Sequence, residues 1–97
     1  MEKYETIFIT KSDITQKQRL ALISQIQNLI STNGEIYDMQ DLGLKKLAYT
    51  VHNYNEGYYD FIKFKSAKSA VEALRKLYQN SDIVLKFLII LSDSTEG

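Results

Sequence analysis

The residues best suited to chemistry lie in segment 41–51, where Lys45 and Lys46 are followed by Tyr49. Lysines neutralise phosphates, and a tyrosine ring offers a flat surface with a hydroxyl group, which together are typical of an RNA contact. Adjacent side chains on a regular strand point to opposite faces, but Gly43 allows a bulge that brings both lysines toward one groove. The alternative is an amphipathic edge strand whose lysines discourage edge-to-edge aggregation.

Residues for catalysis are scarce elsewhere in the chain. The single histidine, His52, lies in a segment expected to turn, and there is no cysteine, so no nucleophile and base are paired. Asp38 and Asp41 differ in parity along a strand and would point to opposite faces. The glycines are scattered, and no group of residues has the spacing of a metal site. The sequence therefore predicts a protein that is not an enzyme and has no metal or other cofactor.

The charge balance argues against an RNA-binding protein that acts alone. Twelve basic and twelve acidic residues cancel in a chain of 97 residues, whereas such proteins are usually basic. The absence of cysteine is typical of a reducing compartment, and no apolar run approaches the roughly 20 residues that span a bilayer. We therefore expect a cytoplasmic protein without a membrane partner, in which the placement of the lysines matters more than their number.

Two amphipathic helices are predicted from capping signals and apolar spacing. Thr15 and Gln18 have the spacing of a capping box, and apolar residues then recur at helical intervals as far as 33–34, where Gly34 is expected to adopt the left-handed cap. Ser66 is expected to cap a second helix that ends before the polar run 79–82. Each helix has one apolar stripe, so both are expected to cover the same face of a sheet.

Four segments are rich in strand-forming residues. Aromatic and β-branched side chains predict strands at 4–10, 35–51, 58–65 and 83–91. Residues 53–57 are expected to form a turn. The resulting order, β-α-β-β-α-β, predicts an α+β ferredoxin-like fold, with a four-stranded antiparallel sheet and two helices on one face. We expect a single domain over residues 1–92 and a short flexible tail at 93–97.

The third predicted strand alternates two sets of side chains. One parity contains Tyr59, Phe61 and Lys63. The other contains Tyr58, Ile62 and Phe64, and it is interrupted by Asp60. We assign the more aliphatic second set to the helix-covered face and the first set to a surface for a protein partner. The strand is aromatic, but the Lys/Arg-Gly-Phe/Tyr signature of RNA-recognition domains is absent and Asp60 would repel phosphate.

The segment Gly43-Leu44-Lys45-Lys46-Leu47-Ala48-Tyr49-Thr50-Val51 closely resembles the hallmark of the bacterial small-subunit ribosomal protein six family. The opening residues 1–6 and the segment 57–59 are also similar to that family, and the resemblance extends over residues 2–92. Members frequently begin with two basic residues, whereas Glu2 precedes Lys3 here. Lysines occupy the basic positions of the hallmark that are frequently arginine, so the charge remains but the planar bidentate fork does not.

The resemblance implies a structural constituent of the small ribosomal subunit that binds the central domain of 16S ribosomal RNA. It also implies a heterodimer with a small basic ribosomal protein, number eighteen of that subunit, which would supply the positive charge that this chain lacks. On this hypothesis Lys45 and Lys46 contact phosphates, and Tyr49 packs against a sugar or base. Lys3 and Lys86, on neighbouring strands, would extend the basic patch, although Lys86 is equally well explained as a solvated strand residue.

The protein partner is expected to use either the helix-free sheet face or the free edge of the second strand, and the isolated chain is expected to be a monomer. One alternative is a ferredoxin-like ligand-sensing or protein-interaction domain that forms homodimers. Its ligand loop would contain glycine after the first strand, but residues 11–14 contain none. A second alternative, an acylphosphatase-like enzyme, requires a loop arginine, whereas both arginines lie in predicted helices.

Overall fold

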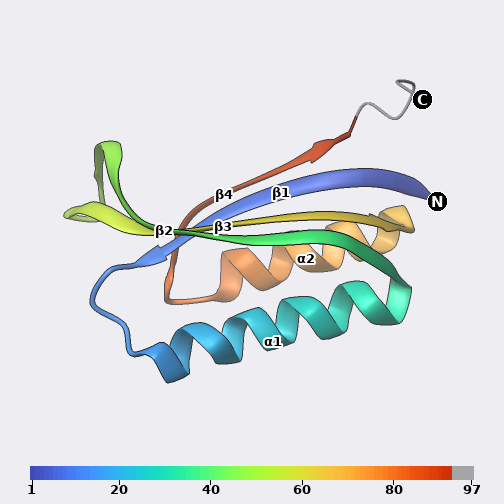
Figure 1. Cartoon of the computed structure of the whole chain (residues 1–97), viewed down its shortest axis with the longest axis horizontal. Helices are drawn as coiled ribbons and strands as arrows, with labels where there is room; N and C mark the ends of the chain where they lie inside the picture. Colours follow the sequence, from blue (N-terminus) through green and yellow to red (C-terminus); the bar gives the residue numbers. More distant parts are fainter. Residues whose placement is uncertain (93–97) are drawn as a thin grey trace.

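The computed structural model of the chain describes residues 1–92 and contains the six predicted elements in the predicted order (Figure 1). Their bounds are β1 Glu2–Lys11, α1 Gln16–Asn33, β2 Gly34–Val51, β3 Tyr54–Ser66, α2 Lys68–Asn80 and β4 Val84–Leu91. The tail expected at 93–97 lies outside the described residues.

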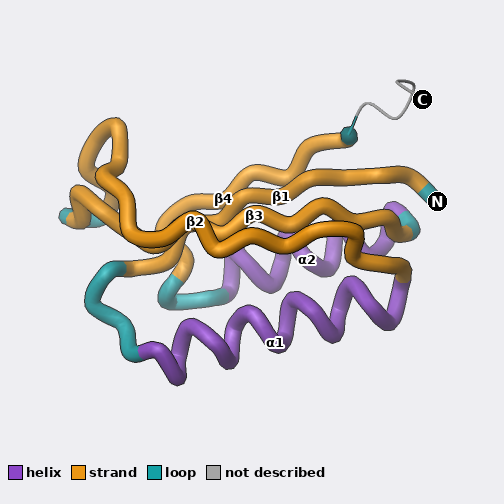
Figure 2. Tube along the Cα trace, viewed as in Figure 1, coloured by secondary structure: helices purple, strands orange, loops and turns teal. Residues whose placement is uncertain are grey.

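The strands form one antiparallel sheet in the order β2-β3-β1-β4. Both helices lie on the same face of this sheet, and the opposite face has no helix (Figures 1 and 2). The predicted ferredoxin-like fold is therefore confirmed. We call the helix-free side the open face; at its centre lie Lys3, Glu5, Ile7 and Ile9 of β1 and their β3 partners Lys65, Lys63, Phe61 and Tyr59.

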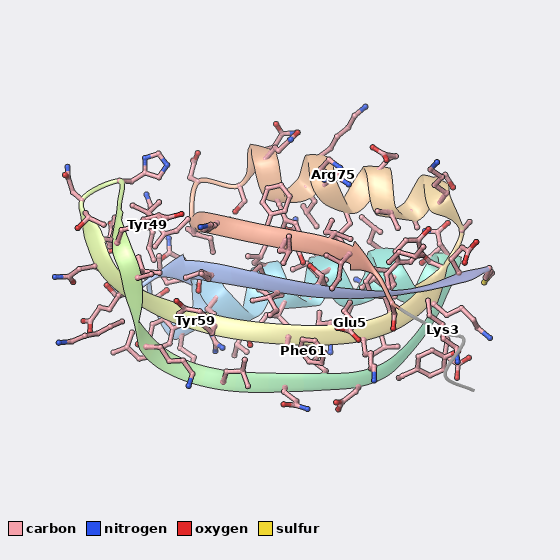
Figure 3. The ribbon with its side chains drawn as sticks, turned by 90° about the horizontal axis from the view of Figure 1, so that it is seen from above. Lys3, Glu5, Tyr49, Tyr59, Phe61 and Arg75 are labelled. Carbon is pink, nitrogen blue, oxygen red and sulfur yellow. The ribbon has the colours of Figure 1, made fainter. Side chains whose placement is uncertain are left out.

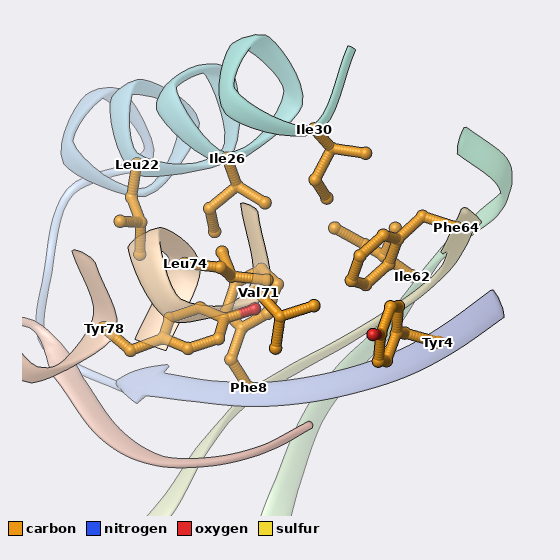
Figure 4. Packing of buried hydrophobic residues seen from close by; sticks show 10 residues of the cluster. All are labelled: Tyr4, Phe8, Leu22, Ile26, Ile30, Ile62, Phe64, Val71, Leu74 and Tyr78. Atoms are coloured by element: carbon orange, nitrogen blue, oxygen red, sulfur yellow. The ribbon is translucent and has the colours of Figure 1, made fainter. Parts of the chain in front are cut away.

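The hydrophobic core lies between the helices and the covered face of the sheet (Figure 4). Phe8 and Ile62 from the central strands are fully buried against Ile26 of α1 and Leu74 of α2. Burying one large apolar side chain stabilises a fold by about 1.5–3 kcal/mol. The apolar stripe on each helix therefore explains why both helices pack against the same face of the sheet.

A buried hydroxyl network joins α2 to the two adjacent strands β1 and β4. The hydroxyls of Thr6 and Tyr78 lie 2.9 Å apart, and the Thr6 hydroxyl is also 2.9 Å from the Leu88 carbonyl, to which it donates. Burial raises the pKa of the Tyr78 hydroxyl far above its ordinary value, while the hydrogen bond with Thr6 acts in the opposite direction. Tyr78 therefore stays neutral and fixes α2 over the sheet.

The predicted start of α1 is confirmed. The backbone N–H of Gln18 donates to the Thr15 hydroxyl over 3.1 Å, and the Thr15 N–H donates to the Gln18 side chain over 2.9 Å. The helix ends at Asn33 as expected, but the reason that we gave for Gly34 is wrong. Its backbone is extended at φ 175°, and a Cβ there would lie only 1.8 Å from the Lys65 carbonyl oxygen. Gly34 is required for close strand contact, not for a left-handed cap.

The predicted cap of α2 is wrong. The helix begins after Ala67, whose side chain makes no capping hydrogen bond. Ser66 is instead the last residue of β3, where it is fully buried and pairs with Glu2 on one side and Gly34 on the other. Pairing on both sides holds Ser66 in the sheet, and its hydroxyl donates to the Ala67 carbonyl over 3.0 Å.

The turn between β2 and β3 is also displaced from its predicted position at 53–57. It consists of His52 and Asn53, which both have positive φ (50° and 70°) and connect the paired residues Val51 and Tyr54. Two positive φ values in a two-residue connection are typical of a type I′ hairpin. Gly57 therefore lies inside β3, where a side chain would meet the Thr10 carbonyl oxygen of β1 at 2.7 Å.

Candidate nucleic-acid interface

The end of the β2–β3 hairpin, residues 44–57, extends beyond the rest of the sheet, and we call it the hairpin arm (Figure 1). The bulge predicted at its base is present. Asp41 pairs with Asp60 and Gly43 with Tyr59, so Leu42 is extra in the ladder. Gly43 has φ +82°, and its N–H donates to the Asp41 carboxylate over 2.9 Å. Glycine allows this conformation without a Cβ penalty.

A second and larger bulge shapes the tip of the arm. Lys46 pairs with Glu56 and Val51 with Tyr54, so the four residues 47–50 stand opposite one residue, Asn55. The extra length curves the arm toward the helix-free side of the sheet (Figure 1). A small cavity of about 90 Å³ lies beneath the arm, lined by Ile9, Leu47, Ala48, Tyr49, Val51, Tyr59 and Lys86. One end of the open face is thus partly covered by the hallmark segment.

This curvature brings two of the predicted RNA-binding residues together. The Lys86 ammonium of β4 lies 4.6 Å from the ring centroid of Tyr49 and donates a hydrogen bond to the Tyr49 hydroxyl. Tyr49 as a residue remains 59% exposed. A cation over an exposed aromatic ring stabilises it by only about 0.5–1 kcal/mol, so both groups remain available to a ligand.

Lys45 and Lys46 lie on the hairpin arm, opposite Gly57 and Glu56 respectively, and both side chains are exposed. Neither takes part in an ion pair within residues 1–92. The Lys46 carbonyl accepts a hydrogen bond of 3.5 Å from the Tyr59 hydroxyl. Both lysines lie on the same exposed arm as Tyr49, but they occupy successive positions of the ladder beyond the Gly43 bulge. Their side chains therefore point to opposite faces of the arm, and the expectation that this bulge brings both toward one groove is wrong.

Lys3 does not join this cluster. It pairs with Lys65, whereas the β1 residue level with the hairpin arm is Lys11, opposite Gly57. Eight residue steps separate Lys3 from Lys11, or about 26 Å along a strand. Figure 3 shows Lys3 and Tyr49 at opposite ends of the sheet. The single basic patch expected from neighbouring strands is therefore two separate groups of lysines.

Tyr37 and Lys65 were missed by sequence reasoning. The Lys3 and Lys65 ammonium groups lie 5.4 and 5.9 Å from the ring centroid of Tyr37. The ladder skips Tyr37, because Ile36 pairs with Phe64 and Asp38 with Lys63. No glycine or other signal at that position predicts this bulge, so parity along β2 could not place the ring.

The proposed protein-partner residues Tyr59, Phe61 and Lys63 lie on the open face, as their parity predicted. Figure 3 shows Tyr59 and Phe61 there. Tyr59 and Phe61 are half-buried and Lys63 is exposed. Phe61 pairs with Ile7, which pairs in turn with Leu88, a residue that is 55% exposed. An apolar row therefore crosses the open face from β3 to β4.

Asp60 lies on the covered face, as its parity with Ile62 and Phe64 predicted, so it does not repel phosphate at the open face. It is 2% exposed on the covered face and accepts hydrogen bonds of 2.9 and 2.8 Å from the Arg19 guanidinium of α1. The same guanidinium lies 3.2 Å from the Asp41 carboxylate and 5.2 Å from the Tyr58 ring centroid. Asp60 shares its parity with the buried residues of β3, and a buried carboxylate requires a partner, so the sequence did contain a signal.

This ion pair anchors the base of the hairpin arm to α1. Burial raises the pKa of Asp60 above its ordinary value, the charge and hydrogen bonds of Arg19 lower it, and Asp41 raises it; the net direction is upward. Because Asp41 and Tyr58 lie where the arm leaves the sheet, the Arg19 contacts hold the base of the arm against α1.

Comparison with known proteins agrees with the hallmark and the fold. The sequence profile of the family described as ribosomal protein S6 matches residues 3–91. The chain belongs to the ribosomal protein S6 family. Small ribosomal subunit protein bS6 of Thermoanaerobacter pseudethanolicus is 38% identical over 94 residues, covering 96% of this chain and 99% of that protein. The bS6 protein of Nitratiruptor sp. is 35% identical over 91 residues, covering 93% of this chain and 71% of that protein.

A solved structure shows the same S6 fold. The crystal structure of 30S ribosomal protein S6 from Thermotoga maritima matches with a TM-score of 0.89 at 23% identity, covering 98% of this chain and 91% of that one. S6 proteins are structural ribosomal proteins, so the prediction that the chain is not an enzyme is confirmed. No helix within residues 1–92 is long and apolar enough to cross a membrane.

Proposed function

We propose that the chain is a structural constituent of the small ribosomal subunit that binds the central domain of 16S ribosomal RNA. It does so as a heterodimer with the small basic ribosomal protein eighteen of that subunit. Membership of the S6 family supports this function. The observation that carries it is the curved hairpin arm, which presents Lys45, Lys46 and the Tyr49–Lys86 pair on one exposed end of the molecule. The setting is cytoplasmic, without a membrane partner.

The hairpin arm supplies the RNA contacts. Lys45 and Lys46 carry exposed ammonium groups that can contact phosphates, which positions the protein on RNA without reading sequence. Tyr49 packs against a sugar or base, and Lys86, freed from the ring, provides a further phosphate contact. Because the Arg19 contacts anchor the base of the arm, these groups are held in place before RNA arrives, which reduces the entropy lost on binding.

The basic protein partner binds the open face at Tyr59, Phe61 and Lys63. The apolar row from Phe61 to Leu88 supplies the hydrophobic centre that protein interfaces have. A neutral chain gains little from phosphate attraction alone, so a basic partner supplies most of the electrostatic affinity through linked binding. Residues 1–92 act as one domain, and the chain is a monomer until it meets the partner.

The test is binding of a central-domain fragment of 16S ribosomal RNA, with and without the basic partner, at two salt concentrations. Tight binding only with the partner is expected. The K45A/K46A variant should weaken binding and reduce the salt dependence by about two phosphate contacts. A matched control is K17A/K76A, in which two exposed helix lysines are removed.

Two results would overturn the proposal. One is the absence of RNA binding by the heterodimer, and the other is equal binding by K45A/K46A and K17A/K76A. Size-exclusion chromatography of the isolated chain tests the remaining alternative, since a stable homodimer would favour a ligand-sensing domain.

A further inference from the structure

Tyr37 is an exposed aromatic residue that the sheet does not require. The β2–β3 ladder passes from Ile36 directly to Asp38, so Tyr37 has no partner on β3. Its side chain is 44% exposed and lies outside the hydrophobic core. Bulges reorient a side chain, and this one directs the Tyr37 ring toward the lysines at the far end of the open face from the hairpin arm.

Two lysines share the surface of this ring. Lys3 of β1 and Lys65 of β3 pair directly, and their ammonium groups lie 5.4 and 5.9 Å from the ring centroid. The ion pairs within residues 1–92 join Arg19 to Asp41, Arg19 to Asp60, and Arg75 to Glu72. Glu35 stands opposite Lys65 in the ladder without forming an ion pair. Within the described part of the chain, both ammonium groups therefore lie against an aromatic ring and not against a carboxylate.

We propose that Tyr37, Lys3 and Lys65 form a second RNA contact that holds an unpaired nucleotide. The base stacks on the Tyr37 ring. The two ammonium groups leave the ring and bind the adjacent phosphates. Stacking on an aromatic side chain accepts any base, because every base has a π-face. The inference rests on the proposed function, to which it adds an attachment point at the opposite end of the open face.

RNA is favoured over a protein partner at this site because of the neighbouring charges. The ammonium groups of Lys3 and Lys65 lie against the ring, and charged residues are depleted at the centre of protein interfaces. The apolar row through Phe61 and Leu88 is the better protein surface. The cluster of a ring with two cations matches a nucleotide, which joins a flat base to a negative phosphate.

The direct test is an NMR titration of the full chain at low salt with octauridylate and with an abasic strand of the same length. Octauridylate should shift the Tyr37 ring protons upfield, and the abasic strand should not. The Y37A variant should lose roughly 5- to 150-fold in affinity with an unchanged salt slope. The Y37F variant should retain binding, and K3A/K65A should reduce the salt slope for this single strand by about 1.4.

The experiments distinguish failure of the Tyr37 site from failure of the proposed function. If K45A/K46A weakens binding of the heterodimer to the 16S fragment and Y37A does not, the proposed function stands and the Tyr37 site is excluded. If the heterodimer fails to bind the fragment while octauridylate still shifts the Tyr37 ring, the site stands and the proposed function fails. Protection of the Tyr37 ring by the basic protein alone would assign the surface to that protein and overturn the inference.

Discussion

The two faces of the sheet use the same kinds of side chain in opposite ways. On the covered face, Arg19 and Asp60 form a buried ion pair beneath the Tyr58 ring. On the open face, Lys86 lies against the exposed ring of Tyr49. Removing water strengthens the first interaction and makes it costly to break, whereas the second is screened by solvent. Cations of the covered face therefore determine the structure, and cations of the open face remain exchangeable for ligands.

The aromatic residues of the two faces differ in the same way. Phe8 is fully buried and its ring lies 5.4 Å from that of Tyr78. Phe61 lies on the open face of the same sheet and is only half-buried. Residue type alone therefore does not distinguish a core position from a binding position. Parity along the strand, together with the helix stripes, does.

The largest expected effect is the loss of a covered-face aromatic. Phe8→Ala should reduce the free energy of unfolding by about 3–5 kcal/mol, because it leaves a cavity in the core. Phe61→Ala, the matched open-face variant, should cost about 1 kcal/mol or less in stability while weakening the affinity for the basic partner. Urea denaturation measures both. Equal stability losses in the two variants would show that Phe61 belongs to the core as Phe8 does.

The next effect is the loss of the buried cation. Arg19→Met should destabilise the fold by at least about 3 kcal/mol, because it leaves the Asp60 charge buried without a partner. The double variant R19M/D60L, which removes both charges, should recover part of this loss. Urea denaturation of the single and double variants measures the free energy of unfolding that is recovered. No recovery in the double variant would show that the pair acts through packing and not through charge.

The stability of the Arg19→Met variant is expected to depend on pH through Asp60. Arg19 lowers the pKa of Asp60, so its removal should raise that pKa further above the unfolded value. A carboxyl with a raised pKa binds more protons in the folded state, and the folded state then gains stability as pH falls. The stability gap between R19M and the original protein should therefore narrow on acidification. A gap that is constant between pH 7 and pH 4 would contradict this role of Asp60.

The sequence predicted those features of the fold and of the candidate site that depend on residues within one helix or strand. The element order, the Thr15 capping box and the parity of Tyr59, Phe61 and Lys63 were predicted correctly, because each follows from spacing within one element. The Gly43 bulge was also predicted, since glycine marks positions that require positive φ.

Features that depend on two elements were not predicted. The pairing of Arg19 with Asp60 joins residues 41 positions apart, and no local pattern relates them. Gly34 and Gly57 were assigned to a cap and a turn, although both are required by a neighbouring strand that passes close to them. The Tyr37 bulge lacks glycine, so the Lys3 contact with that ring could not be inferred from parity.

A smaller effect is expected at the base of the hairpin arm. Gly43→Ala should destabilise the fold by about 1–2 kcal/mol, because Gly43 has φ +82° and a side chain at that φ is strained. Space is not the reason, since an added Cβ would meet nothing within 4 Å. Gly43→Asn is the matched control and should cost less, because asparagine tolerates positive φ. Thermal denaturation of both variants tests the order, and an equal loss would exclude backbone strain as the cause.

The smallest stability effect is expected for the Tyr49–Lys86 pair. Lys86→Ala should change the free energy of unfolding by about 0.5–1 kcal/mol or less, because a cation on an exposed ring contributes no more than that. The same variant should weaken binding of the heterodimer to the 16S fragment and reduce the salt slope by about one. Urea denaturation and salt-dependent binding measure the two quantities on one protein. A loss of stability comparable to that of Arg19→Met would place Lys86 among the structural cations. A small loss of stability together with reduced RNA binding would show that Lys86 serves binding and not folding. Only a cation whose internal contact is weak can exchange that contact for a phosphate.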